Sequence, residues 1–208
     1  FSNDENIKIY VAITDLNNNP KNNLIDELDK RNIKYLYMRA YWWMYPDNES
    51  NKKIKNILRF IITLYSSIKL SFFAKKNKID IIHSNSSVLY IGLLINKFTH
   101  IPHIYHIREF GKEDHNYDYI INKNKCYKLM NKYSNEFICI SSAIYNKFIK
   151  VLDKEKCEVI YNGVKIDKKY TKAKLKKDKS YNILIAGTIK KNKRQLDAIR
   201  AIKILVNK

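Results

Sequence analysis

The sequence predicts an α/β protein with a parallel sheet, and three of its features lead to this fold class. Short apolar segments rich in β-branched residues alternate with helical segments along nearly the whole chain. The helical segments are about ten residues or longer, which suits right-handed crossovers between parallel strands. A hydrophobic content of 45% in 208 residues is enough for a packed core, and four glycines leave no flexible spacer.

The first half of the chain contributes three of the expected strands. Residues 7–13 have the β-branched content and the length of a strand, and residues 22–31 place their aliphatic side chains on one helical face. An aromatic cluster at residues 41–45 precedes Pro46. We expect strands over 7–13, 35–40 and 79–84, and helices over 22–31, 51–76 and 86–98.

The second half continues the alternation. Pro102 introduces a strand, residues 111–116 are polar and predict a loop, and Ser142 is a candidate helix N-cap. Asn162-Gly163 is a strong turn signal at the end of the last strand of this series. We expect strands over 103–108, 136–140 and 158–161, and helices over 117–133 and 143–152.

The end of the chain begins a new strand–helix unit. Residues 181–187 predict a buried strand, followed by a tight turn at Gly187, a lysine-rich loop and a helix. α/β proteins use this order to bind an anion at a helix N-terminus. Residues 165–179 are a lysine-rich connector, so we place a domain boundary between residues 162 and 179. The alternative is a long surface loop within one domain.

Charge and cysteine content limit the partners. The chain has 40 basic and 20 acidic residues, a net charge of +20, which favours an anionic partner such as nucleic acid or a membrane surface. Lysines occur along nearly the whole chain. The alternative is therefore a codon bias toward lysine, asparagine and isoleucine that spreads positive charge over all solvated faces. Cys126, Cys139 and Cys157 are widely spaced, which suits a reducing cytoplasm and predicts neither a disulfide framework nor a metal site.

One segment could touch a membrane. The apolar run 57–73 is interrupted by Arg59 and Lys69, so we expect an amphipathic helix and not a membrane-spanning one. Together with Trp42 and Trp43 it could hold the protein at the inner leaflet. Packing of the tryptophans against that helix is the alternative.

Polar side chains follow the expected strands, where ligands of open parallel sheets bind. They carry hydroxyl, amide, imidazole and cationic groups, which suit a polyol with a phosphate better than a metal. P-loop, Gly-x-Ser-x-Gly and Gly-x-Gly-x-x-Gly motifs are missing from the sequence. The residues concerned are His83, Ser84, Asn85, Arg108, Glu109, Ser141, Ser142, Gly187, Thr188, Lys190 and Lys193.

Five of these segments, in this order and at this spacing, resemble the retaining GT-B glycosyltransferases of family 4, the group-1 glycosyltransferases. The resemblance extends over about residues 7–208. The segments are Ile79-Asp-Ile-Ile-His-Ser-Asn85, Ile101-Pro-His-Ile-Tyr-His-Ile-Arg-Glu-Phe110, Phe137-Ile-Cys-Ile-Ser-Ser142, Val159-Ile-Tyr-Asn-Gly-Val164 and Ile183-Leu-Ile-Ala-Gly187.

The resemblance implies two Rossmann-like domains facing a cleft. Residues 1–164 would form the acceptor-side domain, 165–180 the connector and 181–208 the start of the nucleotide-sugar-binding domain. The implied reaction is transfer of a sugar from a nucleotide-sugar to a glycan or lipid-linked acceptor with retention, in surface polysaccharide synthesis. No cofactor is expected beyond the donor. The expected place is the cytoplasm, with a peripheral position on the inner face of the cell membrane.

Roles for individual residues follow from the same resemblance. Gly187, Thr188 and Lys193 would bind the donor diphosphate; Thr188 stands where many members have arginine, so Lys190 or Lys191 could supply the missing cation. For Lys193 the alternative is a solvated lysine at a helix start. The catalytic residues would be His106 and Arg108. The residues of the acceptor-side cleft would be Ser84, Asn85, Glu109 and Ser141.

Alternatives remain at the catalytic pair and for the whole chain. His106 could be a packed strand histidine, with Arg108 paired to Glu109 or Glu113. The family's first strand, its glycine-rich loop and its donor-binding glutamate motif have no counterpart in the sequence, so we expect a fragment without activity by itself. The rival functions are a basic nucleic-acid-binding α/β domain and a non-catalytic remnant.

Overall fold

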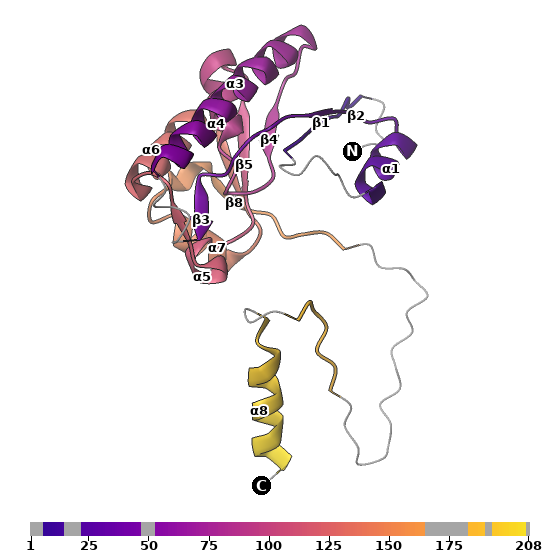
Figure 1. Cartoon of the computed structure of the whole chain (residues 1–208), viewed down its shortest axis with the longest axis vertical. Coiled ribbons are helices and arrows are strands. Elements are labelled where there is room, and N and C mark those ends of the chain that lie inside the picture. The colour runs from indigo at the N-terminus through magenta and orange to yellow at the C-terminus, as the bar shows by residue number, and fades with distance from the viewer. Residues whose placement is uncertain (1–5, 15–21, 47–52, 165–182, 190–192, 207–208) are drawn as a thin grey trace. The chain divides into compact units, whose positions relative to one another are not determined.

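The computed structural model describes residues 6–14, 22–46, 53–164, 183–189 and 193–206. The chain divides into two compact units, Phe1–Tyr161 and Asn162–Lys208. The first unit alternates strands and helices, as Figure 1 shows, and carries the main sheet. The predicted α/β class is confirmed.

The main sheet has four parallel strands in the order β4-β5-β7-β8. Each strand is a short apolar segment, and the connection to the next strand returns the chain to the edge where the strands begin. All carboxyl ends therefore lie at the opposite edge. In the register, Ser84 lies opposite Tyr105, and Ile107 opposite Cys139. The bounds are β4 Ile82–Ser84, β5 His103–Ile107, β7 Glu136–Cys139 and β8 Cys157–Val159.

Two smaller strand pairs complete the first unit. β1 (Tyr10–Ile13) and β2 (Lys34–Tyr37) are parallel, whereas β3 (Met44–Pro46) and β6 (Tyr117–Tyr119) are antiparallel. Among the described strands, neither pair is hydrogen-bonded to the four-stranded sheet.

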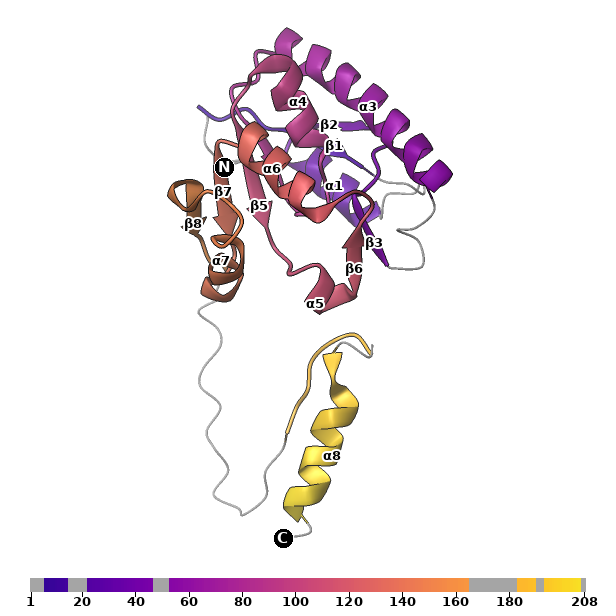
Figure 2. The same ribbon diagram turned by 90° about the vertical axis from the view of Figure 1, so that its left-hand side faces the viewer.

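The helices lie largely where the sequence predicts them. α4 begins about five residues later than expected, because residues 86–89 form a turn that Glu109 holds. Figure 2 shows α3 at the outside of the first unit, beside α4. The bounds are α1 Asn22–Lys30, α3 Lys53–Lys76, α4 Ile91–Thr99, α5 Lys112–His115, α6 Lys123–Tyr133, α7 Ser142–Phe148, a 3-10 helix Lys154–Lys156 and α8 Gln195–Val206.

Three local predictions are wrong. The helix expected over 117–133 is split into β6 and α6, because β6 pairs with β3 across the sequence and tertiary pairing overrides helical pattern. The loop expected over 111–116 contains the short helix α5. The N-cap of α7 is Ser141, whose hydroxyl accepts a hydrogen bond from the backbone N of Ile144 at 3.3 Å, and not Ser142.

The core lies between the main sheet and α4, α6 and α7. Tyr105, Phe137 and Cys139 are fully buried at its centre. Trp43 is also buried; its indole N–H donates to the carbonyl of Ser87 at 2.8 Å and its ring stacks on Tyr90. Trp43 therefore packs in the core and is not available for contact with a membrane.

The second unit contains one described helix, α8. The predicted strand over 181–187 is not formed in its described part: residues 183–189 have no strand partner and are exposed. A strand is stable only when a neighbour satisfies its backbone groups and covers its apolar face, and this unit supplies neither in the residues described. The connector predicted at 165–180 lies outside the described residues.

Candidate functional site at the carboxyl edge of the main sheet

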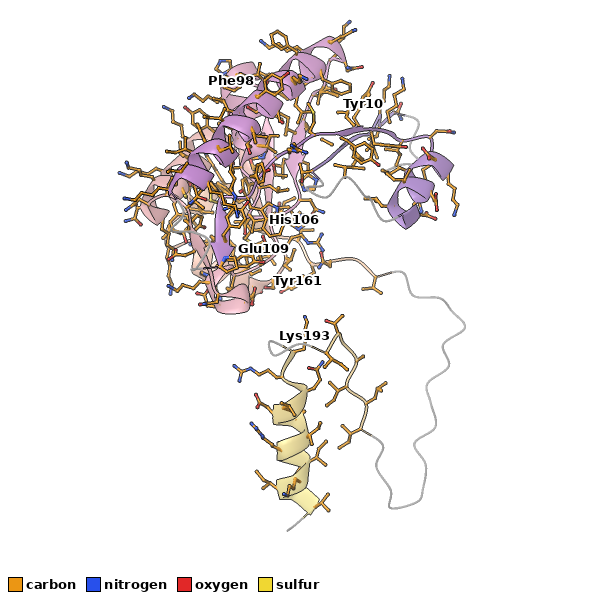
Figure 3. The ribbon with its side chains drawn as sticks, viewed as in Figure 1. Tyr10, Phe98, His106, Glu109, Tyr161 and Lys193 are labelled. Atoms are coloured by element: carbon orange, nitrogen blue, oxygen red, sulfur yellow. The ribbon has the colours of Figure 1, made fainter. Side chains whose placement is uncertain are left out.

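The alternation of β5 creates the site. His103, Tyr105 and Ile107 are buried on one face of the strand, so His106 points to the other face and is half-buried. Beyond the strand, Arg108 is exposed and Glu109 is half-buried. Figure 3 labels His106 and Glu109 in this part of the first unit.

His106 forms a stacked pair with His83. Their ring centroids are 5.5 Å apart and the planes are 12° from parallel. Burial lowers the pKa of both imidazoles below the ordinary value of 6.5, and the Arg108 charge lowers both further. Both histidines are therefore neutral near pH 7.

The ring of His106 has unused hydrogen-bonding capacity. Its two ring nitrogens are buried and have no hydrogen-bond partner among the described residues. Buried polar atoms of this kind are uncommon in folded proteins and occur where a water or ligand completes the bonding. A neutral imidazole offers one donor and one acceptor, which suits a hydroxyl group.

Arg108 bonds to the neighbouring strand end. Its Nη1 donates to Oδ1 of Asn85 at 3.1 Å. The alternative pairing with Glu109 or Glu113 is wrong, because those carboxylates bond elsewhere: Glu109 to a serine turn and Glu113 to Lys147. The guanidinium and the Asn85 amide thus form an exposed polar group beside the histidine pair.

Glu109 organises the backbone of the site. One of its oxygens, Oε1, accepts hydrogen bonds from Ser86 Oγ at 2.7 Å, from Ser87 N at 2.7 Å and from Ser87 Oγ at 2.6 Å. Tyr105 supports the same turn, since its hydroxyl donates to the carbonyls of Ser87 and Leu89. Glu109 therefore joins the end of β5 to the segment that leads into α4.

Ser84 lies inside the protein. Its hydroxyl is 2.9 Å from Nε2 of the fully buried His103, directly beneath Gly92 of α4. Nδ1 of His103 lies 3.2 Å from the carbonyl of Tyr133 and 3.1 Å from Ser134 Oγ. This arrangement holds β4, β5 and α4 together, so of the two neighbouring candidates Asn85 is the exposed one.

Two further hydroxyls lie at the ends of β7 and β8. Ser142 Oγ and the hydroxyl of Tyr161 are 2.8 Å apart, and both side chains are exposed. Ser141 caps α7 with its side chain. The sequence predicts Ser142 at the strand ends, but it carries no local signal that Tyr161, which follows the last strand at the same edge, lies beside it.

A cleft opens beside Phe110, directly after Glu109. It has a volume of about 230 Å³ and its walls include tyrosines from β6 and α6. Three lysines, Lys112, Lys123 and Lys147, also line it and give it a cationic rim. Among the described residues no group of three histidine, cysteine or acidic side chains is arranged to hold a metal ion.

The candidate donor residues lie in the second unit, at the start of α8. Gly187 and Thr188 belong to an exposed turn that Gln195 fixes, since its Nε2 donates to the carbonyl of Thr188 at 2.9 Å. Lys193 is exposed two residues before the helix begins. Lys190 and Lys191, the candidates for an additional cation, lie outside the described residues.

Comparison with known families identifies the chain. The family model described as Glycosyltransferase Family 4 matches residues 23–168, well over half of the sequence. The chain belongs to glycosyltransferase family 4. Among curated proteins, none matches it.

Three crystal structures of Anabaena Alr3699/HepE are similar to this family 4 chain. They are complexes with UDP and glucose, with UDP and with UDP-glucose. Each is 16% identical in sequence, with TM-scores of 0.49, 0.48 and 0.49. The alignments cover 76% of this chain and 45%, 44% and 44% of those chains, so the chain spans less than half of their length.

The described structure of the family 4 chain brings some predicted residues together and separates others. Asn85, His106 and Arg108 meet at one edge. His83, which the sequence also predicts at a strand end, stacks on His106. The signal for this pair in the sequence is that His83 lies near the end of β4, the strand next to the one that carries His106. Ser84 and Glu109 form bonds within the protein instead.

Replacing Glu109 tests its role in the site. We expect Glu109→Ala to lower the free energy of unfolding by about 2 kcal/mol, because the buried Ser87 hydroxyl and N–H lose their acceptor. Glu109→Gln keeps one acceptor oxygen and should lose less. Urea unfolding followed by circular dichroism measures both. Glu158→Ala, at an exposed glutamate of β8, is the control and should change little; an equal loss in both would contradict the assignment.

Proposed function

We propose that this family 4 chain serves a glycosyltransferase that moves a sugar from a nucleotide-sugar to a glycan or lipid-linked acceptor, with retention of anomeric configuration. The observation that carries the proposal is the family match over residues 23–168. Surface polysaccharide synthesis at the cytoplasmic face of the membrane, with the nucleotide-sugar as donor and no other cofactor, belongs to the same proposal.

On the acceptor side we assign the chemistry to His106 and Arg108. The ring nitrogens of His106 are buried and have no partner among the described residues, so a rotation of the side chain would bring one of them to a sugar hydroxyl. Because the imidazole is neutral, it would bind the hydroxyl without placing a second positive charge next to Arg108. Arg108 offers its exposed guanidinium as a hydrogen-bond donor to the same ligand. Asn85 orients the guanidinium through its 3.1 Å hydrogen bond, and Ser141 lies at the same edge of the sheet.

On the donor side we assign the diphosphate to Gly187, Thr188 and Lys193. The N–H groups of Asp197 and Ala198 donate to the carbonyl of Arg194. The earlier N–H groups at the start of α8, together with the helix dipole, would attract an anion. A lysine beside them performs the charge stabilisation that a divalent metal supplies in other transferases. The two sides would belong to two Rossmann-like domains, residues 1–164 and from 181 onward, joined by 165–180.

The 208-residue chain is not expected to turn over by itself. Residues 183–189 are exposed and pair with no described strand, so no described sheet holds the donor-binding turn rigid. We therefore expect weak donor binding and no sugar transfer from this chain alone.

Ligand binding observed by NMR tests the proposal. UDP-glucose is a suitable first probe in a panel of nucleotide-sugars, and acceptor-like oligosaccharides form a second panel. We expect acceptor-like sugars to shift the imidazole resonances of His83 and His106 but not those of buried His103, with Arg108→Gln weakening the response several-fold. Lys193→Ala should weaken donor binding, whereas the control Lys203→Ala, farther along α8, should not.

Two results would count against the transferase. One is the absence of any response to both panels. The other is tight binding of RNA or DNA at physiological salt with a steep salt dependence, which would favour the basic nucleic-acid-binding alternative. Release of UDP during incubation with donor and acceptor would support transfer but contradict the expected inactivity of the chain alone.

A further inference from the structure

Helix α3 has its polar and apolar faces exchanged relative to a helix of a water-soluble protein. Six of its eight buried residues are polar, although buried helix faces are normally apolar. The buried residues are Asn56, Arg59, Thr63, Ser66, Ser67, Leu70, Ser71 and Ala74. The feature needs an explanation, because it inverts the usual driving force for packing.

The polar face is bonded to the protein and cannot turn outward. Thr63 Oγ1 accepts from the backbone N of Tyr41 and donates to the carbonyl of Arg59, both at 2.9 Å. Ser66 Oγ donates to the carbonyl of Arg39 at 2.6 Å. These bonds fix the rotation of α3 about its axis. The opposite face therefore points outward because the polar face is bonded to the rest of the unit.

The outward face is a continuous apolar stripe. Its members recur at three- and four-residue spacing, which places them on one side of the helix. Ile54 is 86% exposed and Phe72 is 72% exposed, so the stripe extends over almost the whole helix. Exposed apolar patches of this extent mark an interaction surface. The stripe consists of Ile54, Ile57, Leu58, Ile61, Tyr65, Ile68 and Phe72.

The charges around the stripe select the partner. α3 contains no acidic residue, and lysines lie near both of its ends at Lys53, Lys55, Lys75 and Lys76. Lys69 lies beside the stripe, with its Nζ 4.6 Å from the ring centroid of Tyr65. The whole chain carries a net charge of +20. An apolar stripe between cationic ends matches a surface with an apolar interior and an anionic outer layer.

We propose that α3 docks the protein in the plane of an anionic lipid bilayer, with the apolar stripe among the acyl chains and the lysines at the headgroups. At 1.5 Å per residue the 24-residue helix is about 36 Å long, and it is the described helix that is long and apolar enough to span a bilayer. Its bonded polar face excludes spanning, since that face would then meet hydrocarbon. The helix therefore lies along the surface.

Vesicle binding by the full 208-residue chain tests the surface, and it requires neither donor nor acceptor, so its outcome is separate from that of the transfer reaction. We expect sedimentation with phosphatidylcholine vesicles that contain phosphatidylglycerol, and little with phosphatidylcholine alone. Ile61→Glu should reduce binding about tenfold or more, because a charge replaces an apolar side chain that would be buried among the acyl chains. Lys53→Glu with Lys69→Glu should reduce it on anionic vesicles by a similar factor.

The matched control is Ile121→Glu, which places the same charge at an exposed isoleucine outside α3. It should leave vesicle binding unchanged, and circular dichroism should show that all variants are folded. The proposal is overturned if the chain does not bind anionic vesicles, or if Ile61→Glu binds as well as the parent. It is also overturned if the lipid-free chain is a dimer that Ile61→Glu dissociates, because a second copy would then cover the stripe.

Discussion

The substitution Gly92→Ala is expected to lower the free energy of unfolding by about 3 kcal/mol, although alanine is the better helix former. A Cβ at this position would lie 2.2 Å from Ser84 Oγ and 2.4 Å from His103 Nε2. Both atoms are buried and bonded to each other at 2.9 Å, so neither can move aside without breaking that bond. Urea denaturation followed by circular dichroism measures the change as a shift of the midpoint.

The control for this experiment is Gly163→Ala. A Cβ there meets nothing within 4 Å, so the change should stay within about 0.5 kcal/mol. Combining Gly92→Ala with Ser84→Ala removes one of the two clashing atoms and should recover part of the loss, which a double-mutant cycle reports as coupling. A Gly92→Ala protein as stable as its parent would contradict the close packing of α4 on β4 and β5.

Acid is expected to destabilise the protein through His103. Burial lowers the pKa of His103 to about 4, from an ordinary value of 6.5. The carbonyl of Tyr133 can only accept, so Nδ1 carries the proton and neutral Nε2 accepts from Ser84. Below pH 6.5 the unfolded chain binds a proton that the folded protein does not. The stabilisation present above pH 6.5 is therefore lost as the pH falls toward 4, by about 3 kcal/mol.

The measurement is the free energy of unfolding at several pH values from 7 to 4. His103→Gln removes the most strongly shifted histidine and should reduce the slope of the profile, even though the variant starts from lower stability. The slope that remains includes the contributions of His83 and His106, whose pKa values are also lowered by burial. His100→Asn removes an exposed histidine from a left-handed position at the end of α4, where asparagine is well tolerated. Its profile should keep the parent's slope. Equal slopes for His103→Gln and the parent would show that His103 is not the group responsible.

The sequence predicted the main sheet well because its strands carry their own signal. β5 and β7 are short runs of β-branched and aromatic residues bounded by turn residues. They pair with each other in parallel. β6 could not be predicted in this way. Tyr117–Tyr119 is a strand because β3 lies opposite, and no local pattern reports a partner about 70 residues away.

The candidate site was predictable in its location but not in its internal bonding. The carboxyl ends of parallel strands had to converge, so Asn85, His106 and Arg108 could be expected together. Which polar side chain is bound up in the interior depends on the face of each strand and on helix packing. Ser84 and Glu109 bond within the protein, whereas Asn85 and Arg108 are exposed, and all four residue types are polar enough to have been expected in a site.

The three hydrogen bonds that converge on one oxygen of Glu109 affect how mutational screens of this region are interpreted. A carboxylate beside His106 and Arg108 has the position of a general base, and in a transferase that contains this domain its loss would lower activity in any survey based on turnover alone. The same loss would arise from the collapse of a turn whose donors bond to no other acceptor in the part of the chain that the structure describes. A variant library must also be scored for folded yield to distinguish a residue that accepts a proton from one that holds the turn in place. At this position we expect the folded yield to fall first.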